Sequence, residues 1–198
     1  YKASLSYSPN EDLLVYGQWV EGFRLGQAAA APSPFCDADN DGILDDVGFS
    51  DPGPLKSDRS ENFELGIKTS LADNRVTVNA AIYRIDWQDM PISIDLPSCG
   101  SKTRLNAGES KSEGVELEVQ ARLTEKFQLD FSASYGESTL AKDQINLGEK
   151  GDNLPGSADF NISIGLEYSF ILAGSEAFVR GDYAYISEYY NTVTVDET

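Results

Sequence analysis

The stretch GVELEVQARLTEKFQLDFSASYG, residues 114–136, decides the fold class of this chain. From Val115 to Leu123 every second residue is apolar and the residues between are polar or charged. A polar turn at 124–126 follows, and the alternation resumes from Phe127 to Tyr135. A period of two is typical of a β-strand with two different faces. The stretch therefore predicts two antiparallel strands joined by a tight hairpin.

Strand-like runs of the same kind occur along the whole chain, and we expect about eight strands and no substantial helix. Besides the quoted pair they lie near residues 1–8, 13–21, 63–71, 75–89, 160–170 and 177–190. Short polar turns near 8–12, 72–74, 124–126 and 173–175 alternate with long irregular segments at 22–60, 90–112 and 139–157. An all-β, antiparallel up-and-down meander with its long loops at one end is typical of outer-membrane barrels.

Composition excludes several classes of function. The 198 residues carry 33 acidic and 15 basic side chains, a net charge of −18, and such a charge repels nucleic acid. Without histidine there is no imidazole base for a serine or cysteine nucleophile, and a His/Cys zinc site is not expected. We predict neither an enzyme nor an organic cofactor. No run of about 18 apolar residues is present, which excludes helical membrane spans and leaves β-barrels open.

The aromatic spacing and the strand count together indicate a piece of a wide barrel. Phe160 and Phe170 lie ten residues apart on one face, and tilted strands convert that spacing to roughly 25 Å, the height of a lipid-facing band. The alternative is that strand aromatics are ordinary core residues. Eight strands with short periplasmic turns would begin and end outside the cell, unlike a complete small barrel. We therefore expect residues 1–198 to form an arc of a large transmembrane β-barrel, with the earlier and last strands absent.

An ordered set of short motifs resembles the barrel of TonB-dependent outer-membrane receptors. The motifs are LVYGQWVEGFRLG (14–26), ENFELGIK (61–68), YRIDWQDM (83–90), NAG (106–108), SEGVE (112–116) and LPG (154–156). The family often has proline at the position of Leu25. The resemblance implies a barrel of about 22 strands around a plug domain that this chain lacks.

The same resemblance implies a function and a set of partners. Such receptors sit in the bacterial outer membrane with their long loops extracellular, and take up a scarce solute such as a ferric siderophore. The energy comes from TonB, which acts through the plug. The expected partners are outer-membrane lipid, TonB and a small extracellular solute, but no nucleic acid. Phe23 and Arg24 are candidates for contact with the solute or the plug, because they lie where the second strand should leave the membrane.

The long acidic loop 22–60 contains a calcium-like pattern, DADNDGILDD, at residues 37–46. Alternating carboxylates before a glycine can converge on one Ca²⁺, which accepts six to eight oxygen ligands. The predicted ligands are Asp37, Asp39, Asp41, the carbonyl of Ile43, and Asp45. An EF-hand would place glutamate at the position of Gly48, so the pattern is closer to thrombospondin-type or dockerin-like repeats. The alternative is a solvated acidic loop, although residues 36–62 carry a net charge of −6.

Two cysteines, Cys36 and Cys99, lie in different long loops on the predicted external side. A disulfide between them suits an oxidising compartment and would connect two loops. The alternative is a pair of free thiols.

Two other classes of function stay open on the sequence. One is a passive porin-like barrel without energy coupling. The other is a secreted calcium-binding β-sandwich, an adhesion or carbohydrate-binding module, which would bury its apolar face between two sheets.

Overall fold

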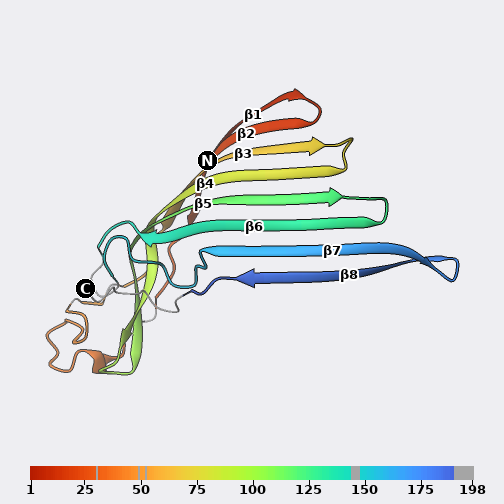
Figure 1. Ribbon diagram of the computed structural model, residues 1–198. Coiled ribbons are helices and arrows are strands. Elements are labelled where there is room, and N and C mark those ends of the chain that lie inside the picture. Colours follow the sequence, from red (N-terminus) through yellow and green to blue (C-terminus); the bar gives the residue numbers. More distant parts are fainter. Residues whose placement is uncertain (30, 49, 52, 144–147, 190–198) are drawn as a thin grey trace.

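Eight strands lie side by side in one curved antiparallel sheet, and each pairs with its neighbours in the sequence (Figure 1). The computed structural model describes residues 1–29, 31–48, 50–51, 53–143 and 148–189. The strands are β1 (Lys2–Asn10), β2 (Leu13–Arg24), β3 (Asp58–Leu71), β4 (Val76–Leu96), β5 (Ser101–Arg122), β6 (Phe127–Leu140), β7 (Phe160–Leu172) and β8 (Ser175–Ile186). The predicted up-and-down meander of eight strands is confirmed. Residue 190, at the end of the predicted last strand, lies outside the described residues.

One end of the sheet carries tight turns, here called the short-turn end. Residues Ala72, Asp73 and Asn74 adopt positive φ between β3 and β4, and Ala173 and Gly174 do so between β7 and β8. Such turns match the right-handed twist of the strands that they join. The opposite, long-loop end carries residues 25–57 and 141–159, and the first of these contains a 3-10 turn, Pro34–Cys36.

The prediction of an irregular segment at 90–112 is wrong. β4 continues to Leu96, and β5 already begins at Ser101. The hairpin of these two strands therefore extends past its neighbours and bends away from the sheet (Figure 1). The alternation continues through Met90, Ile92, Ile94 and Leu96, all of them buried. Pro91 lies within this strand although proline lacks the N–H that a ladder needs. The ladder tolerates it because the register shifts on both sides of Met90, next to Asp89 at φ 55°.

Two clusters of buried apolar side chains lie at the long-loop end. One cluster joins Met90, Ile92 and Ile94 of the extended hairpin to Leu140 at the end of β6. A second joins Cys36 and Leu44 of the 25–57 segment to Leu96. The apolar rows of the main sheet remain exposed instead, from Leu5 on β1 to Tyr185 on β8. A β-sandwich would bury those rows against a second sheet, so the sandwich alternative is wrong for the described residues.

No helix in the described ranges is both long enough and apolar enough to cross a membrane.

Candidate functional site

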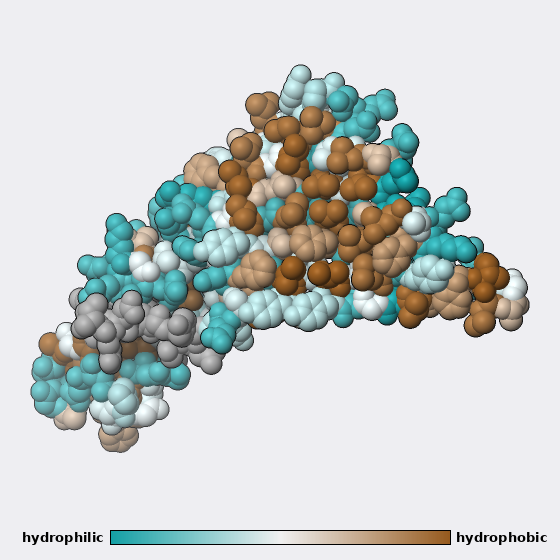
Figure 2. All heavy atoms as spheres, in the orientation of Figure 1, coloured by the Kyte–Doolittle hydropathy of each residue, from teal (hydrophilic) through white to brown (hydrophobic). Residues whose placement is uncertain are grey.

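The register sorts the side chains into two faces, an apolar face and a polar face. On the apolar face, cross-strand partners form continuous rows, one of which is Tyr7, Val15, Ile67, Ala80, Leu117, Ala133, Ile162 and Tyr185. Figure 2 shows hydrophobic residues gathered in a band across the strands, with hydrophilic residues prominent toward the long-loop end. Successive residues of a strand point to opposite faces, so the polar side chains of the same strands share the other face.

The polar face is hollowed near the middle of the sheet. An open hollow of about 530 Å³ is lined by residues of seven strands, β2 to β8, among them Glu64, Lys68, Glu116 and Glu118. The Tyr16 hydroxyl donates a hydrogen bond to Glu64 at 2.6 Å, and the Asn79 amide donates one to Glu118 at 3.0 Å. Three carboxylates face one lysine here, so this hollow favours cationic or hydrogen-bond-donating groups.

Two large side chains lie flat against glycines on the polar face. The Tyr83 ring lies across two glycines on neighbouring strands, Gly114 and Gly136. A Cβ at either position would come within 2.6 Å of the Tyr83 hydroxyl, so only glycine leaves room for the ring. Arg180 lies across Gly165 in the same way and forms ion pairs with Asp130 at 2.7 Å and Asp182 at 2.8 Å. Arg180 and Asp182 therefore hold each other in place on the polar face.

The candidate Arg24 lies at the long-loop end in a compact polar cluster. Its Nε donates to both carboxylate oxygens of Asp58 at 3.0 Å, and the Trp87 indole N–H donates to the same carboxylate at 2.7 Å. The guanidinium also lies over the Trp87 ring, 5.0 Å from its centroid. Asp58 is only 3% exposed, whereas the Arg24 side chain is 57% exposed. The hydrogen bonds from Arg24 lower the pKa of Asp58 despite the opposing effect of burial.

The two candidates Phe23 and Arg24 point to different faces. Arg24 shares the polar face with Tyr16 and Gln18, whereas Phe23 follows Trp19 on the apolar face and is 69% exposed. The structure thus does not bring the two candidates together, and a contact of either with a solute stays a prediction.

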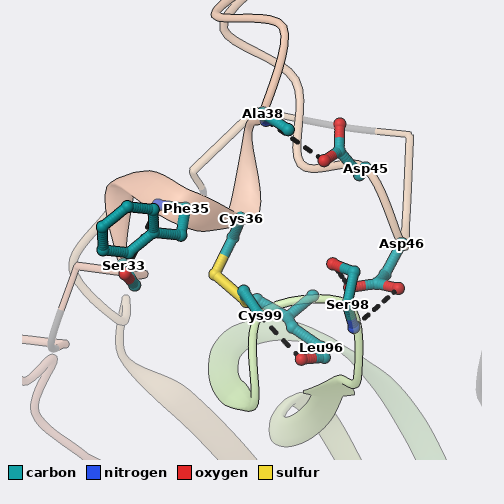
Figure 3. The surroundings of a disulfide bond; sticks show 9 residues. All are labelled: Ser33, Phe35, Cys36, Ala38, Asp45, Asp46, Leu96, Ser98 and Cys99. Carbon is teal, nitrogen blue, oxygen red and sulfur yellow. Dashed lines mark hydrogen bonds between the residues drawn. A yellow bond between two sulfur atoms is a disulfide. The ribbon is translucent and has the colours of Figure 1, made fainter.

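The structure joins Cys36 to Cys99, as predicted, with an S–S distance of 2.04 Å (Figure 3). The bond connects the 25–57 segment to the tip of the extended hairpin. Beside it, the Ser98 amide donates to the carboxylate of Asp46 at 3.2 Å, and the Ala38 amide donates to Asp45 at 3.1 Å. Together with the buried Leu44 and Leu96, these contacts make one small unit of loop and hairpin tip.

Breaking this disulfide should loosen that unit without unfolding the sheet. We expect Cys36→Ser/Cys99→Ser to lower the local opening free energy by about 1–2 kcal/mol, the lower part of the usual range, because the hairpin and the neighbouring strands already hold both segments. Limited proteolysis within residues 38–51 should accelerate about tenfold, and reduced wild-type protein, heavier by two hydrogens, should behave alike. Equal cleavage of oxidised and reduced protein would contradict this assignment.

The predicted calcium ligands are partly brought together. Asp37, Asp39 and Asp45 each place one carboxylate oxygen within 4.8 Å of the others. Asp41 does not belong to that group, and its carboxylate instead accepts a hydrogen bond from the amide of Ile43 at 2.7 Å. Asp37 similarly accepts from the amide of Gly42 at 3.0 Å. An acidic turn without a cation and a loop that binds a cation can both contain these hydrogen bonds. Calcium binding therefore stays a prediction.

Calorimetric titration with Ca²⁺ tests that prediction. An Asp39→Ala/Asp41→Ala variant should bind Ca²⁺ at least about tenfold more weakly than wild type, because fewer carboxylates lower the affinity of a calcium loop. Asp51→Ala removes a carboxylate from the same segment outside the cluster and should bind as wild type does. Equal binding of Ca²⁺ by all three proteins would show that the predicted ligands form no calcium site.

A single curved sheet with an apolar band on one face, a polar hollow on the other and its long connections at one end is a section of a transmembrane β-barrel wall. The chain belongs to the TonB-dependent receptor-like β-barrel family, which it matches over residues 1–198.

Two curated receptors illustrate the relationship. The chain is 28% identical over 145 residues to the probable TonB-dependent siderophore receptor PiuA of Acinetobacter baumannii, and 29% identical over 184 residues to the probable TonB-dependent receptor BfrD of Bordetella pertussis. The alignments cover 72% and 91% of this chain, but 17% and 22% of those receptors. The chain therefore spans about a fifth of the length of these relatives.

Solved structures support the fold. The ferric yersiniabactin uptake receptor FyuA of Yersinia pestis superimposes with a TM-score of 0.71 at 21% identity, covering 96% of this chain and 26% of that one. The ferric preacinetobactin receptor BauA of Acinetobacter baumannii gives 0.68 at 18% identity, with the same coverage. At these identities the likeness establishes the barrel fold.

Proposed function

We propose that this chain forms part of the wall of a bacterial outer-membrane receptor, which takes up a scarce solute such as a ferric siderophore with energy from TonB. The observation that carries the proposal is the two-faced sheet. Its apolar rows are exposed on every strand from β1 to β8, while its polar face carries an open, acidic hollow. Lipid is the solvent that suits the first face, and a water-filled or plugged lumen suits the second.

The lengths of the loops support an orientation for the sheet. Outer-membrane barrels have short periplasmic turns and longer extracellular loops. We therefore assign the disulfide-linked unit and the acidic 25–57 segment to the extracellular side, where a solute arrives. Acting as a receptor rather than an enzyme agrees with the family to which the chain belongs.

The expected plug would meet the acidic hollow. Glu64 lines it from β3, and Glu116 and Glu118 line it from β5, with Lys68 of β3 as the basic side chain among them. Lysine, arginine or amide groups on the facing surface of the plug would complement these carboxylates.

Iron uptake by whole cells tests the function. Cells expressing the full-length receptor gene, cells lacking it, and cells lacking TonB would be compared for uptake of radioactive iron from a panel of ferric siderophores. Uptake that requires both the receptor and TonB is expected. Uptake that requires the receptor but not TonB would favour the passive porin-like alternative, and uptake that is unchanged without the receptor would overturn the proposal.

A further inference from the structure

A second, smaller pocket lies at the long-loop end, apart from the hollow of the polar face. Its volume is about 90 Å³, and it lies between the end of β2, the start of β3 and the extended hairpin. The lining residues are Arg24, Leu25, Gln27, Leu55, Lys56, Asp58, Pro91 and Arg104.

The lining of the pocket has a net positive charge, whereas the chain as a whole is strongly negative. Its lining holds three basic residues, Arg24, Lys56 and Arg104, and one acidic residue, Asp58. The carboxylate of Asp58 is buried and already accepts hydrogen bonds from Arg24 and Trp87. In a chain with a net charge of −18, an excess of two positive charges around so small a space is a local exception.

Donors remain available to a ligand. Arg24 uses Nε and Nη2 on Asp58, and Arg104 uses Nε on the hydroxyl of Ser93 at 3.2 Å. Among the described residues, the Nη1 atom of Arg24, both Nη atoms of Arg104 and the Nζ of Lys56 take part in no hydrogen bond or ion pair. Guanidinium groups bind carboxylates through two parallel N–H donors, and lysine adds a point charge.

The frame of the pocket is fixed by backbone pairing. Gln27 and Leu55 exchange backbone hydrogen bonds of 3.0 and 2.8 Å. The side chain of Asn106 on β5 accepts from the Lys56 amide at 2.7 Å and donates to the Lys56 carbonyl at 3.1 Å. Gly26 permits the close approach, because a Cβ there would come within 2.4 Å of the Leu55 carbonyl. A pocket held this way loses little conformational entropy on binding a ligand.

The location of the pocket suits an incoming solute. Arg24 and Asp58 lie on the polar face of their strands, beyond the apolar band and toward the long loops. A solute that entered from the long-loop end would pass them before it reached the hollow that Tyr16 and Glu64 line.

We propose that this pocket binds a carboxylate group of an anionic ferric chelate. The proposal rests on the proposed function and names the chemical class of its solute. A volume of about 90 Å³ suits one carboxylate with its water, whose own share of liquid volume is about 30 Å³. The body of the chelate remains outside the pocket, at the mouth of the lumen.

Calorimetry on the full-length receptor in detergent tests the pocket, with ferric citrate, citrate and inorganic phosphate as the probes. The test variant is Lys56→Gln/Arg104→Gln, which leaves the Arg24–Asp58 pair intact. The matched control is Lys102→Gln, which removes a charge from the same strand, where Lys102 pairs with Asp95 at 2.8 Å outside the pocket. We expect wild type and control to bind ferric citrate alike and the test variant to bind it about 10- to 100-fold more weakly.

Each other outcome overturns a definite part of the proposal. No saturable binding of ferric citrate or citrate, or equal binding by wild type and the test variant, removes the site. Equal affinity for phosphate and both citrate forms indicates a simple anion site and overturns the assignment to a chelate. Whole-cell iron uptake, measured separately, distinguishes these failures from a failure of the proposed function: uptake that depends on the receptor and TonB, without citrate binding, rejects the pocket alone.

Discussion

Replacing Arg24 with glutamine should lower the free energy of unfolding by about 3–5 kcal/mol, because it leaves the buried carboxylate of Asp58 without its cation. The Trp87 indole N–H would remain as a donor to this carboxylate, and a neutral donor compensates less of the lost solvation than a guanidinium does. Urea unfolding of the receptor in lipid vesicles, followed by tryptophan fluorescence, measures the change.

The reciprocal variant provides the control. Asp58→Asn should cost less, about 1–3 kcal/mol, because it leaves a guanidinium that is already 57% exposed and that water can solvate. The two substitutions remove the same ion pair, and they differ in which partner is left behind. A larger loss for Asp58→Asn than for Arg24→Gln would contradict the assignment of the burial cost to the carboxylate.

Acid should weaken the same cluster. Because Arg24 lowers the pKa of Asp58, the pair contributes its full stabilisation above the usual aspartate pKa of about 3.9. That contribution is lost as the pH falls from this value through the lower pKa of the folded state. In wild type, amide exchange at the start of β3 should therefore accelerate below about pH 4, whereas Asp58→Asn should remove this step.

The strands could be predicted from the sequence because alternation is a local property. A run such as Val115 to Leu123 shows both faces without knowledge of its partners, and polar turns mark where each strand ends. The pairing of Cys36 with Cys99 was accessible for a different reason, since a chain with two cysteines allows one intramolecular bond. The extension of β4 beyond Asp89 was missed, although Met90, Ile92, Ile94 and Leu96 continue the alternation.

The polar cluster and the pocket could not be predicted in the same way. Arg24 and Asp58 are 34 residues apart, and Asp58 and Trp87 are 29 apart. Lys56 approaches the hairpin through Asn106, 50 residues away. Which of these residues meet depends on the strand register and on the length of the 25–57 segment, and neither follows from a local pattern. The sequence signal that could have indicated Asp58 is an acid placed just before an alternating strand, which many solvated loops share.

Two neighbouring alanines of β4 test the membrane assignment directly. Ala80 lies on the apolar face between Ile67 and Leu117, whereas Ala81 lies on the polar face between Gly66 and Glu116. We expect Ala80→Arg to lower the free energy of unfolding in lipid vesicles by about 2–4 kcal/mol, the cost of a cation at the bilayer midplane. The same substitution at Ala81 should change stability by well under 1 kcal/mol, because its guanidinium would face the carboxylates of the hollow.

The two variants distinguish a face that contacts lipid from a face that contacts protein. Both substitutions add the same bulk and charge to adjacent positions of one strand, so strand propensity and steric size cancel between them. If the apolar face packed against protein, Ala80→Arg would lower the free energy of unfolding by a similar amount in bilayers of any thickness. In lipid, by contrast, the cost of a charge depends on its depth in the bilayer. Ala80→Arg should therefore become less destabilising in thinner bilayers, with Ala81→Arg unchanged. Equal losses for the two variants, independent of the bilayer, would end the assignment of this face to lipid.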